Sequence, residues 1–220
     1  MKLLGFAALA ALLLMSVPAE AGQVKFSDGP GSPGGEFIIT VVSGNVGPYT
    51  VGESWVGFCL ETTEYMNFSD TFTATIADYA HKGSDPSGKD PLSAESAYLY
   101  TKFSEGTLLY DPADPGLGGY DGTATDADAL QRAFWILEDE TYSGGTATQT
   151  LKWVAEAQNA VATGAWIGLG NVRVMNITND STGKLAQSQL IMVPVPAAGL
   201  LGIAMLSGLA VVRRIRRRRG

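Results

Sequence analysis

The chain of 220 residues contains one cysteine and one histidine, which leaves little material for two common kinds of site. A single cysteine cannot form an internal disulfide, and one histidine rarely supplies the usual histidine-based zinc sites or catalytic dyads. Basic residues are also scarce in the middle of the chain. Positions 22–193 hold eight lysines and arginines against 21 acidic residues, a balance of −13. This acidity argues against a nucleic-acid partner.

The composition that is present favours a β protein rich in turns. Charged residues make up only 17% of the chain, and glycine occurs 27 times. Strands separated by glycine-containing turns are typical of such a composition, whereas a cytosolic helical enzyme usually carries more charge.

The N-terminal segment has the order of features found in export signals. Lys2 precedes an apolar run over residues 3–15, and Ala19-Glu20-Ala21 places small residues where a signal peptidase requires them. We therefore predict a signal peptide over residues 1–21, cleaved after Ala21, and an exported protein.

The C-terminal segment predicts a membrane helix. Residues 197–212 are 16 consecutive uncharged positions, and as a helix they span roughly 24 Å, somewhat less than the hydrocarbon core of a bilayer. The arginine-rich tail at 213–219 follows at once, and the positive-inside rule places it in the cytoplasm. The globular part of the chain is then expected outside the cytoplasm.

The same C-terminal segment resembles the PEP-CTERM sorting signal of Gram-negative bacteria, in its V-P-x-P-A variant. Val193-Pro194-Val195-Pro196-Ala197, a short apolar helix and a terminal arginine cluster occur in the family's order, although Val195 stands where the name-giving form has glutamate. The resemblance implies recognition by an exosortase-like sorting protease, and delivery to the cell surface or extracellular matrix after processing. The residues that carry it are Val193, Pro194, Pro196, Ala197, Arg213, Arg214, Arg216, Arg217, Arg218 and Arg219.

Between the two ends we expect a flexible leader over 22–35 and a globular domain over 36–193. Residues 22–35 are rich in glycine and proline, which favours a loose segment. In 71–76 the residues Phe72, Ala74 and Ile76 alternate with threonines, and we expect these three to point inward. Strands are predicted at 36–42, 49–61, 71–76, 169–177 and 188–193, and helices at 93–103, 126–141 and 149–163. This order indicates an α+β fold with a mostly antiparallel, barrel- or sandwich-like β core and helical insertions.

The central domain resembles the thioester domain of bacterial surface adhesins. In that family a cysteine after an aromatic residue is joined to the glutamine of a T-Q-x-A-I-W-type helix. Here the segments are 58–61 (FCLE) and 130–138 (LQRAFWILE). Two positions depart from the pattern, because Leu130 replaces the usual threonine and Phe134 replaces an aliphatic residue.

The resemblance implies an internal thioester between Cys59 and Gln131, formed with release of ammonia. A thioester is an acyl donor that water hydrolyses, so it needs an apolar shelter, for which Phe58, Phe134 and Trp135 are the candidates. The protein is then not expected to be an enzyme. It is expected to be a surface protein that couples covalently to a partner carrying amine or hydroxyl groups.

Three alternatives remain open at the level of sequence. The first is a non-covalent polysaccharide-binding or structural surface module, in which Cys59 is a small buried residue. A separate structural interpretation is that Gln131 faces solvent while Leu130, Phe134 and Trp135 pack a core. The second is a hydrolase that pairs Cys59 with His81, and the third is calcium binding by aspartates near the helix at 126–141. No cofactor or metal is expected. The aspartates are Asp111, Asp114, Asp121, Asp126 and Asp128, and a sugar-binding surface could use Tyr98, Tyr100, Tyr110 and Tyr120.

Overall fold

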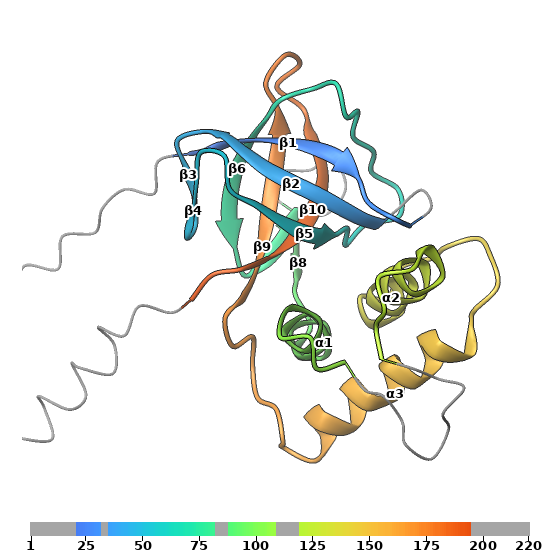
Figure 1. The fold of residues 1–220 in the computed structure, drawn as a ribbon. Coiled ribbons are helices and arrows are strands. Elements are labelled where there is room, and N and C mark those ends of the chain that lie inside the picture. The colour runs from blue at the N-terminus through green and yellow to red at the C-terminus, as the bar shows by residue number, and fades with distance from the viewer. Residues whose placement is uncertain (1–20, 32–34, 82–87, 109–118, 195–220) are drawn as a thin grey trace, which may run out of the picture.

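The computed structural model describes residues 21–31, 35–81, 88–108 and 119–194, and these form an α+β fold (Figure 1). The strands are β1 (Gln23–Asp28), β2 (Gly35–Ser43), β3 (Asn45–Val46), β4 (Tyr49–Thr50), β5 (Ser54–Phe58), β6 (Phe72–Ala77), β7 (Tyr79–His81), β8 (Lys89–Pro91), β9 (Val172–Asn179) and β10 (Leu185–Met192). The helices are α1 (Ala94–Ser104), α2 (Ala124–Leu137) and α3 (Thr148–Ala162). The predicted α+β class with a mostly antiparallel sheet is confirmed.

Six strands form one antiparallel sheet in the order β10-β9-β6-β1-β2-β5. Its two edges meet just beyond the end of β5. Cys59 forms a β-bridge with Gln189 of β10, and the Leu60 N–H donates to the Ser188 carbonyl at 3.1 Å. We call this contact between residues 59–60 and 188–189 the seam. The sheet therefore curves far enough for its first and last strands to touch.

The prediction of a flexible leader over 22–35 is wrong for its first half. Residues Gln23–Asp28 form β1, which pairs with β2 on one side and β6 on the other. Val24 and Phe26 of this strand are buried, and Phe26 packs edge-on against Phe37 and Phe72. Val24 and Phe26 alternate with polar residues, as in a half-buried strand, but the glycines and prolines at 29–35 outweighed this short pattern in the prediction. The folded domain thus begins at β1 and not at residue 36.

Most other predicted elements lie where the sequence places them, but the predicted burial of one side chain is wrong. In β6, Phe72 and Ala74 are buried as predicted, but Ile76 is 36% exposed because it lies near the end of the strand. Ser93 caps α1 by accepting a hydrogen bond from the Ser96 N–H. Thr123 caps α2 in the same way, so this helix begins at Ala124, two residues before the predicted start, and ends at Leu137.

Two apolar cores lie on opposite faces of the sheet. The helices gather on one side of the sheet (Figure 1), and there Phe58, Leu130, Phe134 and Trp153 pack in the helix-side core. The second, the inner core, lies within the curve of the sheet and includes Phe26, Ile39, Phe72, Met175 and Cys59. Burial of these two sets of apolar side chains is the main force that holds helices and sheet together.

None of the helices in the described part of the chain has the length and apolar character needed to cross a bilayer. The predicted signal peptide, the predicted membrane helix at 197–212 and the arginine tail at 213–219 lie outside the described residues, apart from Ala21. Val193 and Pro194 of the predicted sorting signal directly follow β10, and the Val193 N–H donates to the Asn171 carbonyl at 2.7 Å.

Candidate functional site

Cys59 lies at the seam with its side chain in the inner core. Its neighbours Phe58 and Leu60 belong to the helix-side core, as the alternation of an extended segment requires. Cys59 has no exposed surface. The change of face at each residue therefore separates the thiol from its aromatic neighbour Phe58.

Gln131 lies on the face of α2 that is directed toward Cys59, just beyond the end of β5. Residues Gln131 and Trp135 are one turn apart on this face, whereas Leu130 and Phe134 turn into the helix-side core. Gln131 is only 2% exposed. The interpretation in which Gln131 faces solvent is therefore wrong.

The structure brings Cys59 and Gln131 together through two reciprocal hydrogen bonds. The Cys59 N–H donates to Gln131 Oε1 at 3.0 Å, and Gln131 Nε2 donates to the Cys59 carbonyl at 2.7 Å. Both bonds are buried, so the side-chain amide is held in one orientation against the cysteine backbone.

Gly35, at the start of β2, makes room for this amide. A Cβ atom at position 35 would lie 2.2 Å from Gln131 Oε1, far inside van der Waals contact. Glycine is thus the residue type that allows the glutamine side chain to pass the β2 backbone and reach Cys59. No sequence pattern indicates this role, because residue 35 is one of several glycines in a glycine- and proline-rich stretch.

The electrostatics of the site keep the thiol protonated. Burial raises the pKa of the Cys59 thiol well above its usual value, and the charge of Glu61 adds to the shift, while a hydrogen bond from the Trp135 side chain opposes it. Burial also raises the pKa of Glu61 to about 8. At neutral pH both groups therefore hold their protons for much of the time.

The three predicted shelter residues lie in two different places. Phe58 and Phe134 pack against each other in the helix-side core, with ring centroids 5.2 Å apart. Trp135 packs against the inner core and contacts Tyr142, at 5.7 Å between ring centroids. Trp135 thus lies on the same side as the Cys59 thiol. Phe58 and Phe134 instead pack the end of β5 against α2 in the helix-side core.

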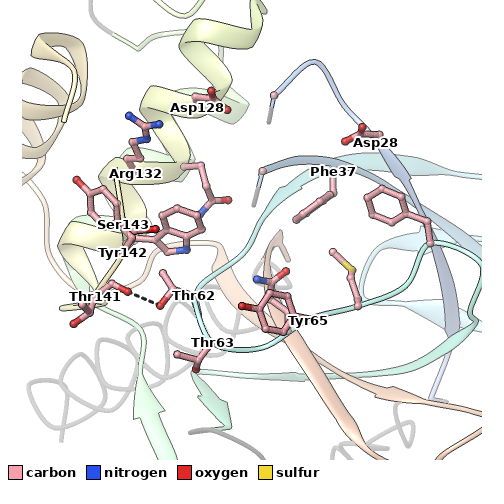
Figure 2. A pocket seen from close by; sticks show the side chains of 17 residues that line it. Asp28, Phe37, Thr62, Thr63, Tyr65, Asp128, Arg132, Thr141, Tyr142 and Ser143 are labelled. Carbon is pink, nitrogen blue, oxygen red and sulfur yellow. Dashed lines mark hydrogen bonds between the residues drawn. The ribbon is translucent and has the colours of Figure 1, made fainter. Parts of the chain in front are cut away.

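A cavity of about 590 Å³ opens next to the pair. Gln131 and Trp135 line it, and Cys59 does not. Figure 2 shows Asp128 and Arg132 projecting from α2, Thr62, Thr63 and Tyr65 from the segment after the seam, and Asp28 and Phe37 from the opposite strands. A molecule in this cavity therefore contacts Gln131 and not Cys59.

Hydrogen bonds on two sides hold the segment that follows Cys59. The Thr62 hydroxyl donates to Glu140 Oε2 at 2.8 Å, and it also lies 2.9 Å from the Thr141 carbonyl (dashed in Figure 2). Gln187 Nε2 donates to the Glu61 carbonyl at 2.8 Å. Residues 59–62 are therefore held between β10 and the segment after α2.

The weaker candidates have structural partners elsewhere. The His81 N–H donates to Asn176 Oδ1 in the β7–β9 region, and His81 does not line the cavity. Asp121 and Asp126 form a capping network with Thr123 at the start of α2. Within the described residues no cluster of histidine, cysteine, aspartate and glutamate has the arrangement of a metal site. Asp111, Asp114 and Tyr110 lie outside those residues.

The tyrosines considered for sugar binding mostly pack inside the fold. Tyr100 is buried and its hydroxyl donates to the Val56 carbonyl at 2.6 Å, while Tyr98 donates to Glu156 at 2.7 Å. The Tyr120 hydroxyl bonds to Glu36. The exposed aromatic residues at the cavity are instead Tyr65 and Phe68, and no sequence pattern indicated either of them.

Comparison with known proteins gives no assignment. No family model, curated protein or solved structure matches the chain.

Proposed function

We propose that the protein is an exported surface protein in which Cys59 and Gln131 form an internal thioester that couples the domain covalently to a partner. The observation that carries this proposal is the pair of buried hydrogen bonds between the Gln131 amide and the Cys59 backbone. The two residues are 72 positions apart in the chain, and both are buried. Gln131 places its amide carbonyl against the backbone N–H of Cys59.

The hydrogen bonds suit the first chemical step. The Cys59 sulfur attacks Cδ of Gln131, and the carbonyl oxygen gains negative charge as the tetrahedral intermediate forms. The Cys59 N–H already donates to that oxygen, so it stabilises the oxyanion without reorganisation. The C–N bond then breaks, and the amide nitrogen leaves as ammonia with the proton that the thiol gave up. The products are a Cys59–Gln131 thioester and one ammonia.

The cavity suits the second step. An external amine or hydroxyl that enters the cavity reaches Gln131, which lines it. Attack there forms an amide or ester at Gln131 and returns the Cys59 thiol with a proton from the nucleophile. The mostly buried setting of the bond limits hydrolysis by water in the meantime.

The two ends of the chain support the cellular part of the proposal. A signal peptide over 1–21 exports the domain, the helix over 197–212 anchors it with the arginine tail in the cytoplasm, and the sorting signal directs an exosortase-like protease to the tail. The partner then lies at the cell surface or in the extracellular matrix.

Methylamine incorporation tests the proposal. The purified full-length protein is treated with methylamine, digested and analysed by mass spectrometry. Conversion of Gln131 to its N-methyl amide, with one new titratable thiol per chain, is expected. The Cys59→Ala variant should take up no methylamine. If Gln131 is recovered as ordinary glutamine after this treatment, the proposal is wrong.

One observation favours a second function, the non-covalent binding of polysaccharide. The cavity combines aromatic rings of Tyr65, Trp135 and Tyr142 with the carboxylates of Asp28 and Asp128, a set of groups that stacks on sugars and bonds to their hydroxyls. This function predicts that binding to matrix polysaccharide survives in Cys59→Ala, whereas covalent coupling predicts that retention on the partner after denaturation is lost in that variant.

A further inference from the structure

Glu61 is a buried carboxyl group that the thioester reaction described above does not use. It lies two residues beyond Cys59 and is 5% exposed. The seam continues past Cys59, because Leu60 bonds to Ser188 and Glu61 lies opposite Gln187. Two residues of chain span at most about 7 Å between Cα atoms, so the Glu61 carboxyl lies within side-chain reach of Cys59 and of the Gln131 amide bonded to it.

Only one of the two carboxylate oxygens of Glu61 has a fixed partner. Oε2 accepts a hydrogen bond from the Ser188 N–H at 2.8 Å. Oε1 is buried and has no hydrogen-bond partner among the described residues. A buried polar atom without a partner costs about 1–3 kcal/mol, so an oxygen left in this state calls for an explanation.

We propose that Glu61 carries the proton between the Cys59 thiol and the leaving nitrogen of Gln131. This inference rests on the proposed thioester and deepens it, because it names the group that moves the proton. The Ser188 N–H holds one oxygen, and the other is left to exchange a proton with the reacting groups. Glu61 thereby acts on the same atoms in formation of the bond and in its opening.

The proton balance of the reaction closes with Glu61 unchanged. The ionised carboxylate takes the thiol proton, and the thiolate attacks Cδ of Gln131. When the C–N bond breaks, the carboxyl returns the proton to the departing nitrogen, which leaves as ammonia. Proton transfer by a positioned side chain accelerates such steps by about 10²–10⁴-fold, and it is most effective when the group titrates near the working pH.

The charged groups near Glu61 are acidic and come from two further positions. Glu64, on the same segment, raises the pKa of Glu61 after the larger effect of burial. Glu140, from the segment after α2, faces Glu64 and also acts on Cys59, and it is itself held by the Thr62 N–H and hydroxyl. From β10 the facing groups are the uncharged Gln187, Ser188 and Gln189. These surroundings make the Glu61 carboxylate a stronger base than an exposed one.

The test measures re-formation of the thioester in the folded full-length protein. Concentrated ammonium opens the bond and restores Gln131 and the thiol, and rapid removal of ammonium starts re-formation. Loss of one ammonia per chain is then followed by intact mass at several pH values. Glu61→Gln keeps an oxygen acceptor for the Ser188 N–H but cannot carry the proton. Glu64→Gln is the matched control, and Glu61→Asp restores a carboxyl group.

We expect wild type and Glu64→Gln to re-form the bond with rates that rise as pH passes through the titration of Glu61. Glu61→Gln should be about 100-fold slower or more, with little dependence on pH in this range, and Glu61→Asp should recover part of the rate. If Glu61→Gln equals wild type in rate and pH profile, or if Glu61→Asp is no faster than Glu61→Gln, the inference is overturned while the thioester stands. If wild type never loses ammonia, the proposed function itself fails.

Discussion

The Gln131 amide and the Cys59 backbone hold each other by two hydrogen bonds of 3.0 and 2.7 Å at the point where the edges of the sheet meet. The consequence is that the carbonyl which a thiol would attack is already polarised by an N–H of the attacking residue. An ordinary buried glutamine needs its hydrogen bonds for stability alone. Here the same bonds also suit an acyl transfer.

Adding one methyl group at Gly35 should displace Gln131. The new Cβ would lie 2.2 Å from Oε1, so Gly35→Ala should push the amide away from Cys59 and reduce the thioester-containing fraction by at least about tenfold. Overpacking of this kind costs about 1–3 kcal/mol of unfolding free energy, so the domain should remain folded. Intact mass and thermal unfolding measure the two effects. The control is Gly145→Ala, where an added Cβ meets no atom within 4 Å. A fully formed thioester in Gly35→Ala would contradict this role of the glycine.

The central position of β1 can be checked by stability measurements. Phe26→Ala removes a buried ring that contacts Phe37 and Phe72 and should lower the unfolding free energy by about 3–5 kcal/mol. Lys25→Ala, on the exposed face of the same strand, should change it by no more than about 0.5 kcal/mol. Urea denaturation provides the comparison. Equal effects of the two changes would mean that residues 23–28 form no strand in solution.

Stability should fall as the pH rises through the titration of Glu61. Its pKa is raised from the usual 4.5 to about 8 in the folded state by burial. Between these values the folded state binds more protons than the unfolded state, so the unfolding free energy decreases with pH and levels off above about 8. The loss is on the order of a few kcal/mol.

This pH dependence is best measured in Cys59→Ala, where no thioester forms. Adding Glu61→Gln should flatten the decrease, although part of it should remain because burial also raises the pKa of Glu64 and Glu138. An unchanged slope in the double variant would show that Glu61 ionises in the folded protein as it does in the unfolded chain.

The sequence predicted the long elements well because their patterns are local. The serine cap of α1, the apolar spacing of α2 and the alternation of β6 depend on neighbouring residues, and each appears in the structure within a few positions. By contrast, β1 is rich in polar and charged residues, and only its pairing with β2 and β6 makes it a strand. The alternation of Val24 and Phe26 with polar residues is a local strand pattern, but it is short and is followed by a glycine- and proline-rich stretch.

The candidate site divides in the same way. Cys59 and Gln131 were singled out by a family resemblance, and the structure places them in contact. Gly35 and Glu61 were not, because their roles depend on which strands and helices come together at the seam. The separation of Phe58 from the thiol, by contrast, could have been inferred from the alternation of an extended segment.

The terminal arginines should be needed for correct handling of the C-terminal segment. Changing all six arginines in 213–219 to neutral residues removes the positive charge that, by the positive-inside rule, orients the predicted membrane helix. By the sorting resemblance, the same change also prevents recognition by the sorting protease. We expect unprocessed or misoriented precursor, detected by the size of the protein and by protease accessibility in spheroplasts. Unchanged mature size and unchanged surface delivery would argue against the sorting signal.

The intact mass of the freshly purified protein, without reducing agent or added amine, tests the central claim most directly. Wild type should be lighter than its processed sequence by the mass of one ammonia, and Cys59→Ala and Gln131→Ala should each show the full mass of their sequences. After unfolding in acid the wild-type thiol should remain unreactive to alkylation, because the thioester holds it. A wild-type chain of full mass whose Cys59 labels completely on unfolding would contradict the thioester and leave the hydrogen-bonded pair as a purely structural contact.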